Sequence, residues 1–284
     1  MTGFDRSSGS RTVVVIPQWQ GSAARDPQRL AKGAYRLSAL LPAARRTVVD
    51  IDPRPGQDLD GVRHLDVLTR SLEATRAALG RNGDDPLLSV GGDCGIELAP
   101  VARAVARHGD NLAVVWFDAH ADLNTPDTSP SGGFHGMVLR TLLGQGPSPL
   151  VPRPEERLSS RQIVLAGVRA LDPAERDFIE SERIRALSVQ ALREPGPLIS
   201  AVAGTGATHL YIHLDLDVLD PEHFTSLSCP EPEGLHPDQL RAALHALTKR
   251  FSLAGMGITE HAPAADSASS DHVLRTILDG VAFE

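Results

Sequence analysis

The chain has 284 residues, 41% of them hydrophobic, and a formal net charge of −8 at pH 7. This apolar content excludes an intrinsically disordered chain, and the acidic balance, without a long basic run, excludes a typical nucleic-acid binder. Two cysteines are too few for a disulfide framework, and the chain shows neither a run of about 18 apolar residues nor a secretory signal. We therefore expect a cytoplasmic protein that binds neither nucleic acid nor membranes.

Short β-branched runs predict strands, and they alternate along the chain with longer segments of helical period. The expected strands are Thr12–Pro17, Thr47–Ile51, Leu87–Val90, Leu112–Phe117, Gln162–Ala166, Thr208–Leu214 and Leu253–Ile258. The expected helices are Pro27–Leu41, Leu65–Leu79, Ile96–Arg107, His135–Leu143, Pro173–Glu182, Pro237–Thr248 and Ser270–Gly280. Apolar strands separated by helices indicate a mainly parallel sheet covered on both faces. The sequence thus predicts one three-layer α/β/α domain over residues 1–284, with residues 1–10 as a flexible segment.

Two clusters of ligating side chains follow predicted strands, where ligands of an open parallel sheet bind. They are Asp118, His120 and Asp122 in WFDAHADLNTP, and Asp215 and Asp217 in HLDLDVLDP. Alternate residues of an extended backbone point to one side, so each cluster converges. One aspartate at a strand end is usually a cap or a turn former, but four aspartates and a histidine would repel one another without a cation. The clusters therefore predict a metal site, and their carboxylates favour two Mn²⁺ ions that share ligands.

The turn GGDCGIELAP, residues 91–100, follows an apolar strand and contains Cys94. The thiol can serve there as a metal ligand, as a nucleophile or as a small core residue. The turn alone does not decide among these roles.

The motifs GGDC, DAHAD, DLDVLDP and ITEHAP, in this order, resemble the pattern of the ureohydrolase (arginase/agmatinase) family, and most closely its arginase-like members. The resemblance covers about Pro86–Pro263 and implies the three-layer α/β/α fold of that family. It implies a hydrolase that cleaves the guanidino group of arginine, or of a close guanidino amino acid, to urea and an amine such as ornithine. The attacking group would be a hydroxide that bridges two metal ions. The resemblance also implies a homo-oligomer, a trimer or a hexamer.

The same resemblance assigns metal-binding roles. It makes ligands of two Mn²⁺ ions out of Asp118, His120, Asp122, Asp215 and Asp217. Asp118 and Asp215 would bridge the ions, and Asp122 would also orient the hydroxide. Cys94 stands where the family usually has a histidine ligand to the first ion, and we expect it to be a ligand of that ion. Because thiolate is softer than imidazole, Fe²⁺, Co²⁺ or Zn²⁺ can replace Mn²⁺ there.

Further residues match the family's catalytic and substrate-binding positions. His135, in SPSGGFHGMVL, matches a histidine that relays protons, and Glu260 matches a glutamate that grips the guanidinium through charge-assisted hydrogen bonds. Asn124 and Ser131 match residues that bind the α-carboxylate of the substrate, and Asp172 matches one that meets its α-ammonium group. Together they favour an α-amino-acid substrate.

Alternatives remain at this point. Gly133 and Cys229 replace an Asn and a Thr that are usual in arginases, which leaves room for an N-hydroxyarginine hydrolase or an agmatinase-type enzyme. A non-catalytic relative, weakened at Cys94, is disfavoured because His135, Glu260 and both aspartate clusters are intact. A metal-dependent amide deacetylase on a related fold would need a pair of neighbouring histidines that the motifs do not contain.

Overall fold

The computed structural model describes residues 12–41, 45–82, 86–264, 268–279 and 281. Within these ranges one parallel sheet has the strand order β2-β1-β3-β8-β7-β4-β5-β6. Its strands are β1 Thr12–Ile16, β2 Arg45–Val48, β3 Leu87–Gly91, β4 Leu112–Phe117, β5 Ile163–Ala166, β6 Arg185–Leu187, β7 His209–Asp215 and β8 Ser252–Thr259. The α-helices are α1 Gln28–Leu40, α2 Leu65–Gly80, α3 Leu98–His108, α4 Val138–Leu142, α5 Pro173–Glu182, α6 Pro195–Ala203, α7 Pro237–Arg250 and α8 Ala268–Leu278.

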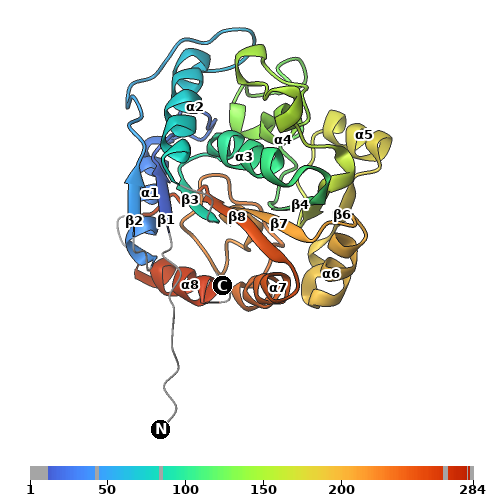
Figure 1. The fold of residues 1–284 in the computed structure, drawn as a ribbon. Helices are drawn as coiled ribbons and strands as arrows, with labels where there is room; N and C mark the ends of the chain where they lie inside the picture. The colour runs from blue at the N-terminus through green and yellow to red at the C-terminus, as the bar shows by residue number, and fades with distance from the viewer. Residues whose placement is uncertain (1–11, 42–44, 83–85, 265–267, 280, 282–284) are drawn as a thin grey trace.

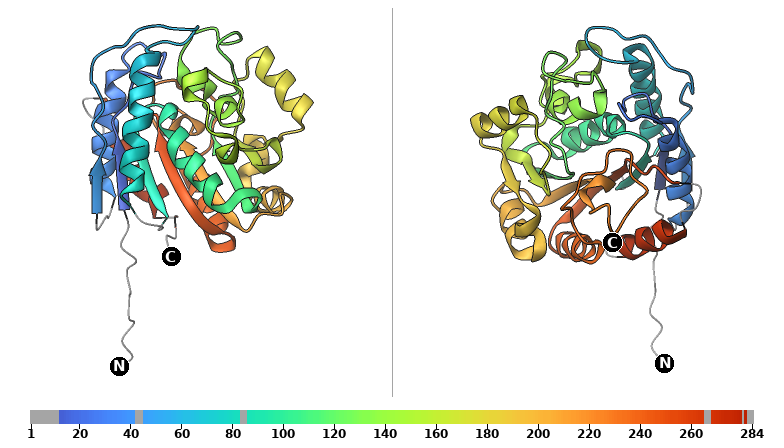
Figure 2. Two further views of the ribbon diagram at one scale, coloured as in Figure 1. Left: turned by 45° about the horizontal axis from the view of Figure 1, so that its top comes forward. Right: turned by 180° about the vertical axis from the view of Figure 1, so that it is seen from behind.

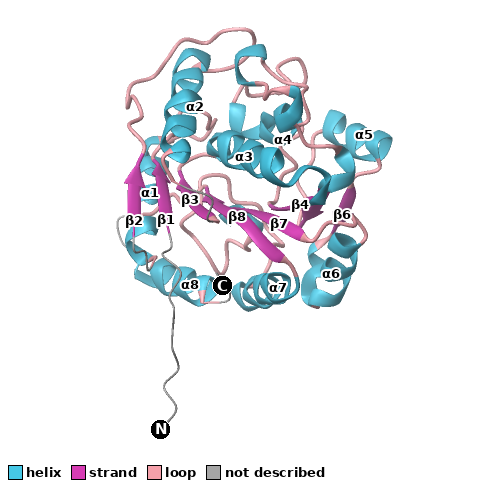
Figure 3. Ribbon diagram, viewed as in Figure 1, coloured by secondary structure: helices cyan, strands magenta, loops and turns pink. Residues whose placement is uncertain are grey.

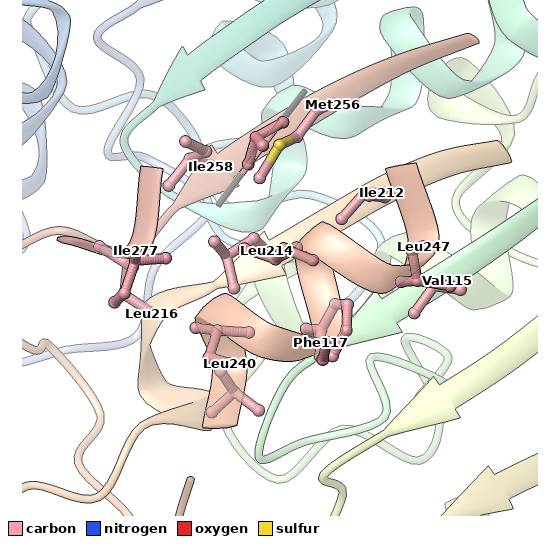
Figure 4. Packing of buried hydrophobic residues seen from close by; sticks show 14 of the residues in the cluster. Val115, Phe117, Ile212, Leu214, Leu216, Leu240, Leu247, Met256, Ile258 and Ile277 are labelled. Carbon is pink, nitrogen blue, oxygen red and sulfur yellow. The ribbon is translucent and has the colours of Figure 1, made fainter. Parts of the chain in front are cut away.

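The helices cover both faces of the sheet (Figures 1 and 3). One apolar core joins the sheet to α1, α6, α7 and α8, and a second joins the opposite face to α2, α3, α4 and α5. The two further views show the same layers (Figure 2). In the first core, Phe117 of β4 and Leu214 of β7 pack with Leu240 and Leu247 of α7 (Figure 4). The predicted three-layer α/β/α fold is confirmed.

Alternation along the central strands decides which side chains meet which helices. In β4, Phe117 belongs to the first core and Trp116 to the second. In β7, Leu214 belongs to the first and Tyr211 to the second. Because side chains alternate along a strand, Asp215 at the end of β7 projects toward the layer of α2 to α5.

Some predicted elements were wrong in extent, and two were not predicted. The strand β2 starts at Arg45 and ends at Val48, so the second half of the predicted strand Thr47–Ile51 is not strand. The predicted helix His135–Leu143 begins as the 3₁₀ helix η3, Phe134–Met137, before α4. The three-residue β6 at the sheet edge is too short for a clear pattern, and α6 begins with Pro-Gly-Pro, which disfavours a helix prediction.

Two further expectations concern residues outside the part of the chain that the structure describes. They are the expected N-terminal segment 1–10 and the last residue of the predicted helix Ser270–Gly280. No helix in the described ranges is both long and apolar enough to cross a bilayer.

The helix α1 packs closely against the backbone near the site at Gly33. A Cβ on Gly33 would lie 1.7 Å from the carbonyl oxygen of His261, which follows β8. We therefore expect Gly33→Ala to lower the free energy of unfolding by about 1–3 kcal/mol, since backbone atoms must move to admit a methyl group. Urea denaturation measures this change.

The matched control is Gly80→Ala at the end of α2, where a Cβ meets nothing within 4 Å. This substitution should be neutral or stabilise the chain by about 0.4–1 kcal/mol. Equal effects of the two substitutions would show that the packing of α1 against His261 is not tight.

Candidate metal centre

The carboxyl ends of four adjacent strands, β3, β8, β7 and β4, carry the candidate site. The strand β4 ends at Phe117 and β7 ends at Asp215, and the two strands pair in register from Leu112↔His209 to Phe117↔Leu214. The two aspartate clusters predicted from sequence are therefore neighbours in space. This is the edge where open parallel sheets bind ligands.

The described residues form two groups of ligating atoms, each group with its atoms within 4.8 Å of one another. Asp118 belongs to both groups. The first contains Cys94, Asp118, His213 and Asp215, and the second contains Asp118, His120 and Asp217. The structure thus brings together five of the six residues that the sequence predicts as metal ligands, and it adds His213. The histidine lies inside an apolar strand, so the sequence pattern did not single it out.

Burial and mutual repulsion dominate the electrostatics of the aspartates. Burial, followed by the charges of Asp217 and Asp118, raises the pKa of Asp215 well above its ordinary value. Burial and the charge of Asp118 raise the pKa of Asp217 from 3.8 to about 6. Asp118 itself has a lowered pKa: burial opposes its charge, but the neighbouring imidazoles of His120 and His213 outweigh burial. A cation between these carboxylates would relieve the repulsion.

His120 is held between the two clusters. Its Nδ1 lies 3.0 Å from Asp217 Oδ2 and 3.4 Å from Asp118 Oδ1, and its Nε2 lies 3.8 Å from Glu231 Oε1. Burial opposes a charge on the ring, but the carboxylates of Asp217 and Asp118 raise the pKa of His120 far above its ordinary value. In the metal-free chain the positively charged imidazolium takes the place of a metal ion between these carboxylates.

Asp122, the remaining predicted ligand, lies outside both groups but faces the same charges. It is 3% exposed, and its Oδ2 is buried without a hydrogen-bond partner. Burial and then the charge of Asp118 raise its pKa well above 3.8. Its backbone φ is +54°, in the left-handed region that non-glycine residues rarely adopt. An unpartnered buried carboxylate oxygen in a strained backbone fits a ligand to a metal ion, so the residues present suit a divalent cation.

Cys94 begins the 3₁₀ helix η1, Cys94–Glu97, directly after β3. Its Sγ lies 3.0 Å from Asp215 Oδ2 and 3.4 Å from Thr259 Oγ1, and the side chain is 1% exposed. Burial and the charge of Asp215 raise the pKa of the thiol well above its usual value. Without a cation the sulfur is therefore a protonated donor to Asp215, which excludes a free thiolate nucleophile in the metal-free chain.

Asp93, which the sequence analysis did not assign, anchors the turn that carries Cys94. Its Oδ1 accepts hydrogen bonds from Gln18 Nε2 at 2.9 Å and from the Gly95 N–H at 2.8 Å, and its Oδ2 accepts one from the Gly21 N–H at 2.9 Å. Its place directly before a helix start is the signal that could have identified it. This cap fixes the position of the Cys94 side chain.

Glu260 and His135 face each other beside the first group. Glu260 is 1% exposed, and its Oε1 accepts a hydrogen bond from the Cys94 N–H at 3.3 Å and lies 3.5 Å from His135 Nδ1. Ser228 donates its hydroxyl to Glu260 Oε2. The Nε2 atom of His135 accepts a hydrogen bond from the Ala23 N–H at 3.3 Å. Burial opposes a charge on His135, but hydrogen bonding to Glu260 raises the pKa of the ring.

Two of the three residues predicted to bind the amino-acid end of a substrate lie together. Asn124 Nδ2 donates to Asp172 Oδ2 at 2.8 Å, and Asn124 Oδ1 accepts from Thr128 Oγ1 at 2.8 Å. Ser131 is exposed, and its hydroxyl accepts a hydrogen bond from the Gly133 N–H within its own loop at 3.1 Å. Asp172 also precedes α5 and caps its first turn.

Arg169 is a third residue that the sequence did not identify, after His213 and Asp93. Its guanidinium donates to five backbone carbonyls, including those of Asp217 at 2.9 Å, Glu231 at 2.8 Å and Pro232 at 2.8 Å. It thereby ties the end of the second aspartate cluster to the loop that carries Glu231. A lone arginine in a loop gives no signal of this role before the fold is known.

Comparison with known proteins gives consistent results. The model of the arginase family matches residues 18–281. The chain is 30% identical over 258 residues to the arginase of Staphylococcus aureus strain MRSA252, covering 84% of this chain and 85% of that protein. The structure is similar to that of Entamoeba histolytica arginase, with a TM-score of 0.81 and 23% identity over 95% of this chain and 97% of that chain. It is also similar to Bacillus cereus arginase, with a TM-score of 0.77 and 26% identity over 95% and 96% of the two chains.

The raised pKa of Asp217 predicts how the metal-free chain responds to pH. Because the pKa is about 6 in the folded chain and ordinarily 3.8, the folded state holds a proton that the unfolded state has lost. The resulting stabilisation is complete below pH 4 and is lost as pH rises through 6. We expect metal-free Asp217→Asn, which cannot ionise, to match wild type near pH 4 and to exceed it at pH 8 by roughly 1–3 kcal/mol.

Chemical denaturation of the chelator-treated proteins from pH 4 to pH 8 measures this difference. Addition of Mn²⁺ at pH 8 should reverse the order, because only the wild type offers this carboxylate to the ion. A variant less stable than wild type throughout the pH range without metal would contradict the inferred repulsion.

Proposed function

This chain belongs to the arginase family and is a ureohydrolase, and we propose that it hydrolyses arginine, or a close guanidino amino acid, to urea and an amine. The family model spans residues 18–281, and the chain covers most of its curated arginase relative. The single observation that carries the proposal is the position of Glu260. Its buried carboxylate lies beside the metal-ligand group, where it can pair with a guanidinium that faces the ions.

We propose that two divalent ions, Mn²⁺ as is usual in the family, occupy the two groups of ligating atoms. The residues that would hold them are Cys94, Asp118, His120, Asp122, Asp215 and Asp217. When bound, such an ion pair supplies an activated water as nucleophile and polarises the carbon that is attacked. Asp118 is the one residue common to both groups, which supports its role as a bridge.

The residues of the chain bind and orient the guanidinium. Glu260 is held from two sides, by the Cys94 N–H and by the Ser228 hydroxyl. An ionised carboxylate so fixed offers charge-assisted hydrogen bonds to the two terminal nitrogens of a guanidinium. Those bonds aim the central carbon of the substrate toward the aspartates. They also stabilise the positive charge that the substrate retains while it is attacked.

His135 is placed to move protons at the same spot. Its Nε2 accepts from the Ala23 N–H, so a neutral ring carries its proton on Nδ1, the atom that faces Glu260. The raised pKa keeps this imidazole available as a proton donor near neutral pH. We propose that His135 delivers a proton to the amine that leaves.

The amino-acid end of the substrate would meet Asn124, Ser131 and Asp172. The hydrogen bond between Asn124 and Asp172 preorganises two of these groups. Asp172 presents a carboxylate to an α-ammonium group, and Ser131 presents a hydroxyl to an α-carboxylate. Agmatine lacks the carboxylate and would leave polar groups of the site unpaired, which costs binding free energy.

We further propose that the chain acts in the cytoplasm as a homo-oligomer, a trimer or a hexamer as its family resemblance implies. Both cysteines, Cys94 and Cys229, are free thiols, which supports a reducing compartment. A non-catalytic relative would not need Glu260, His135 and the buried aspartates held together.

Urea release from L-arginine tests the proposed function. The chain, incubated with Mn²⁺, should release urea, and Asp122→Asn should abolish turnover and lower the bound metal while the fold, measured by circular dichroism, stays intact. Asp122 Oδ2 has no hydrogen-bond partner, so the substitution breaks no hydrogen bond at that atom. Full activity of Asp122→Asn, or no urea from any guanidino compound tested, would refute the proposal.

His135→Ala should slow turnover by about 10²–10⁴-fold with little change in bound metal, because general acid–base groups contribute about that much. His245→Ala, on the exposed face of α7, is the matched control and should retain full activity. Steady-state rates and metal analysis of both variants check this. Loss of a metal ion in His135→Ala would reassign the histidine as a ligand.

We expect kcat/KM to be higher for arginine than for agmatine, and Ser131→Ala to reduce that preference, because the lost hydroxyl would bind the α-carboxylate that agmatine lacks. Ser131 is exposed in its loop, so the fold should survive. Ser148→Ala, at an exposed position outside the site, should leave the preference unchanged. A higher kcat/KM for agmatine than for any guanidino amino acid would contradict the assignment of this end of the site.

A further inference from the structure

The first group of ligating atoms includes a fully buried histidine. His213 is in the middle of β7 and is 0% exposed, and neither of its ring nitrogens has a hydrogen-bond partner. Two unpartnered ring nitrogens in a protein core are costly. The side chain therefore needs an account beyond apolar packing, although its ring stacks on Trp116 with centroids 3.6 Å apart.

The ring points at the aspartates. His213 Nε2 lies 3.9 Å from Asp118 Oδ2, too far for a hydrogen bond but near enough for both atoms to contact one ion. Cys94 Sγ and Asp215 Oδ2 lie 3.0 Å apart on the other side of the same group. Bonds of about 2.0–2.3 Å to a tetrahedral ion place ligand atoms roughly 3.3–3.8 Å apart. The atoms of the group, all within 4.8 Å of one another, are spaced near those values.

A buried carboxylate stands behind the histidine. Glu97, the last residue of η1, is 0% exposed, and both of its carboxylate oxygens lack hydrogen-bond partners. Its Oε2 lies 3.5 Å from His213 Nδ1. Histidines that bind a metal through one nitrogen usually direct the other at a carboxylate, which fixes the tautomer and the ring orientation. Glu97 and His213 have this arrangement.

The sheet leaves space for this carboxylate. His213 of β7 and Ser89 of β3 both lie in register with Gly257 of β8, the strand between them. A Cβ on Gly257 would lie 1.9 Å from Glu97 Oε1. The glycine thus lets Glu97 reach the histidine across the sheet. The space at Gly257 thus fits the Glu97 carboxylate.

We propose that His213 is a metal ligand, so that the first ion is held by sulfur, nitrogen and two carboxylates from Cys94, His213, Asp118 and Asp215, with Glu97 orienting the imidazole. This inference rests on the proposed function for the existence of a metal centre, and it deepens that function by naming the ion. One thiolate and one imidazole suit Zn²⁺ better than Mn²⁺. The second group, built from carboxylates and His120, keeps the harder ligand set.

Zinc X-ray absorption of the full-length chain tests the ligand set directly. The measurement uses His120→Asn, which removes the imidazole of the second group, loaded with one equivalent of Zn²⁺. The predicted coordination shell contains one sulfur and one imidazole. A Co²⁺-loaded sample should show a near-ultraviolet thiolate-to-metal band that Cys94→Ser abolishes and Cys229→Ser retains. A shell with sulfur and no imidazole, or a band that depends on Cys229, would overturn the inference.

Competition with a chromophoric chelator gives the affinities. Glu97→Gln should weaken Zn²⁺ binding at the first site by about 10–100-fold, as loss of a carboxylate behind a ligating histidine typically does, and His213→Gln should weaken it at least as much. His209→Gln, at the other end of β7, is the matched control and should not change it. Most sites bind Zn²⁺ more tightly than Mn²⁺, so the informative quantity is the Zn²⁺/Mn²⁺ affinity ratio, which His213→Gln should lower.

The role of His213 can still be tested if one of the variants does not fold. If His213→Gln does not fold because Glu97 loses its partner, the double variant Glu97→Gln/His213→Gln, which also removes the carboxylate charge, takes its place. The zinc absorption measurement is made on a chain that keeps His213, so it does not depend on either variant. An unchanged Zn²⁺ affinity in a folded His213 variant would make the histidine a core residue. If the chain releases urea but the coordination shell of its zinc lacks imidazole, this inference alone is overturned. If the zinc has the predicted coordination shell but the chain is inactive on every guanidino compound, the proposed function alone is overturned.

Discussion

The repulsion among buried carboxylates is the constraint on which the site depends. Asp118, Asp215 and Asp217 are each at most 2% exposed, and they lie at the ends of two paired strands. The groups that contact them are imidazoles, a thiol, an indole and backbone amides. These donors offset part of the repulsion, and burial together with the repulsion that remains raises the pKa values of Asp215 and Asp217. A pair of cations between these carboxylates would relieve the repulsion that remains.

The backbone around the cluster is arranged to hold these side chains in place. Asp122 and Glu260 both have left-handed backbones, with φ of +54° and +60°, and the N–H of Glu260 donates to the Gly92 carbonyl at 2.8 Å. Such conformations persist only where the surrounding structure enforces them, and they concentrate at functional sites. Nearby, Asp93 caps the turn of Cys94 and Arg169 binds carbonyls around the second cluster, so side chains also hold the turns that carry the candidate ligands.

The sequence predicted the features that depend on local pattern. Apolar strands such as Leu112–Phe117 and the polar residues directly after them identified the sheet, its layers and the residues brought together at its edge. It could not predict features that depend on register between distant strands. His213 reads as an interior strand residue, and Glu97 reads as a helix residue. They meet because β7, β8 and β3 place Gly257 between them. The short edge strand β6 was not predicted for another reason. It has only three residues, which are partly exposed and show no clear apolar alternation.

The central claim is that the buried aspartates form one centre for two ions. Crystals of the metal-loaded protein, measured at the absorption edges of the bound metals, test it most directly. The account predicts two anomalous peaks about 3.5–4 Å apart, both in contact with Asp118, one beside Asp215 and Cys94 and the other beside His120 and Asp217. A single peak, or peaks that Asp118 does not contact, would contradict it.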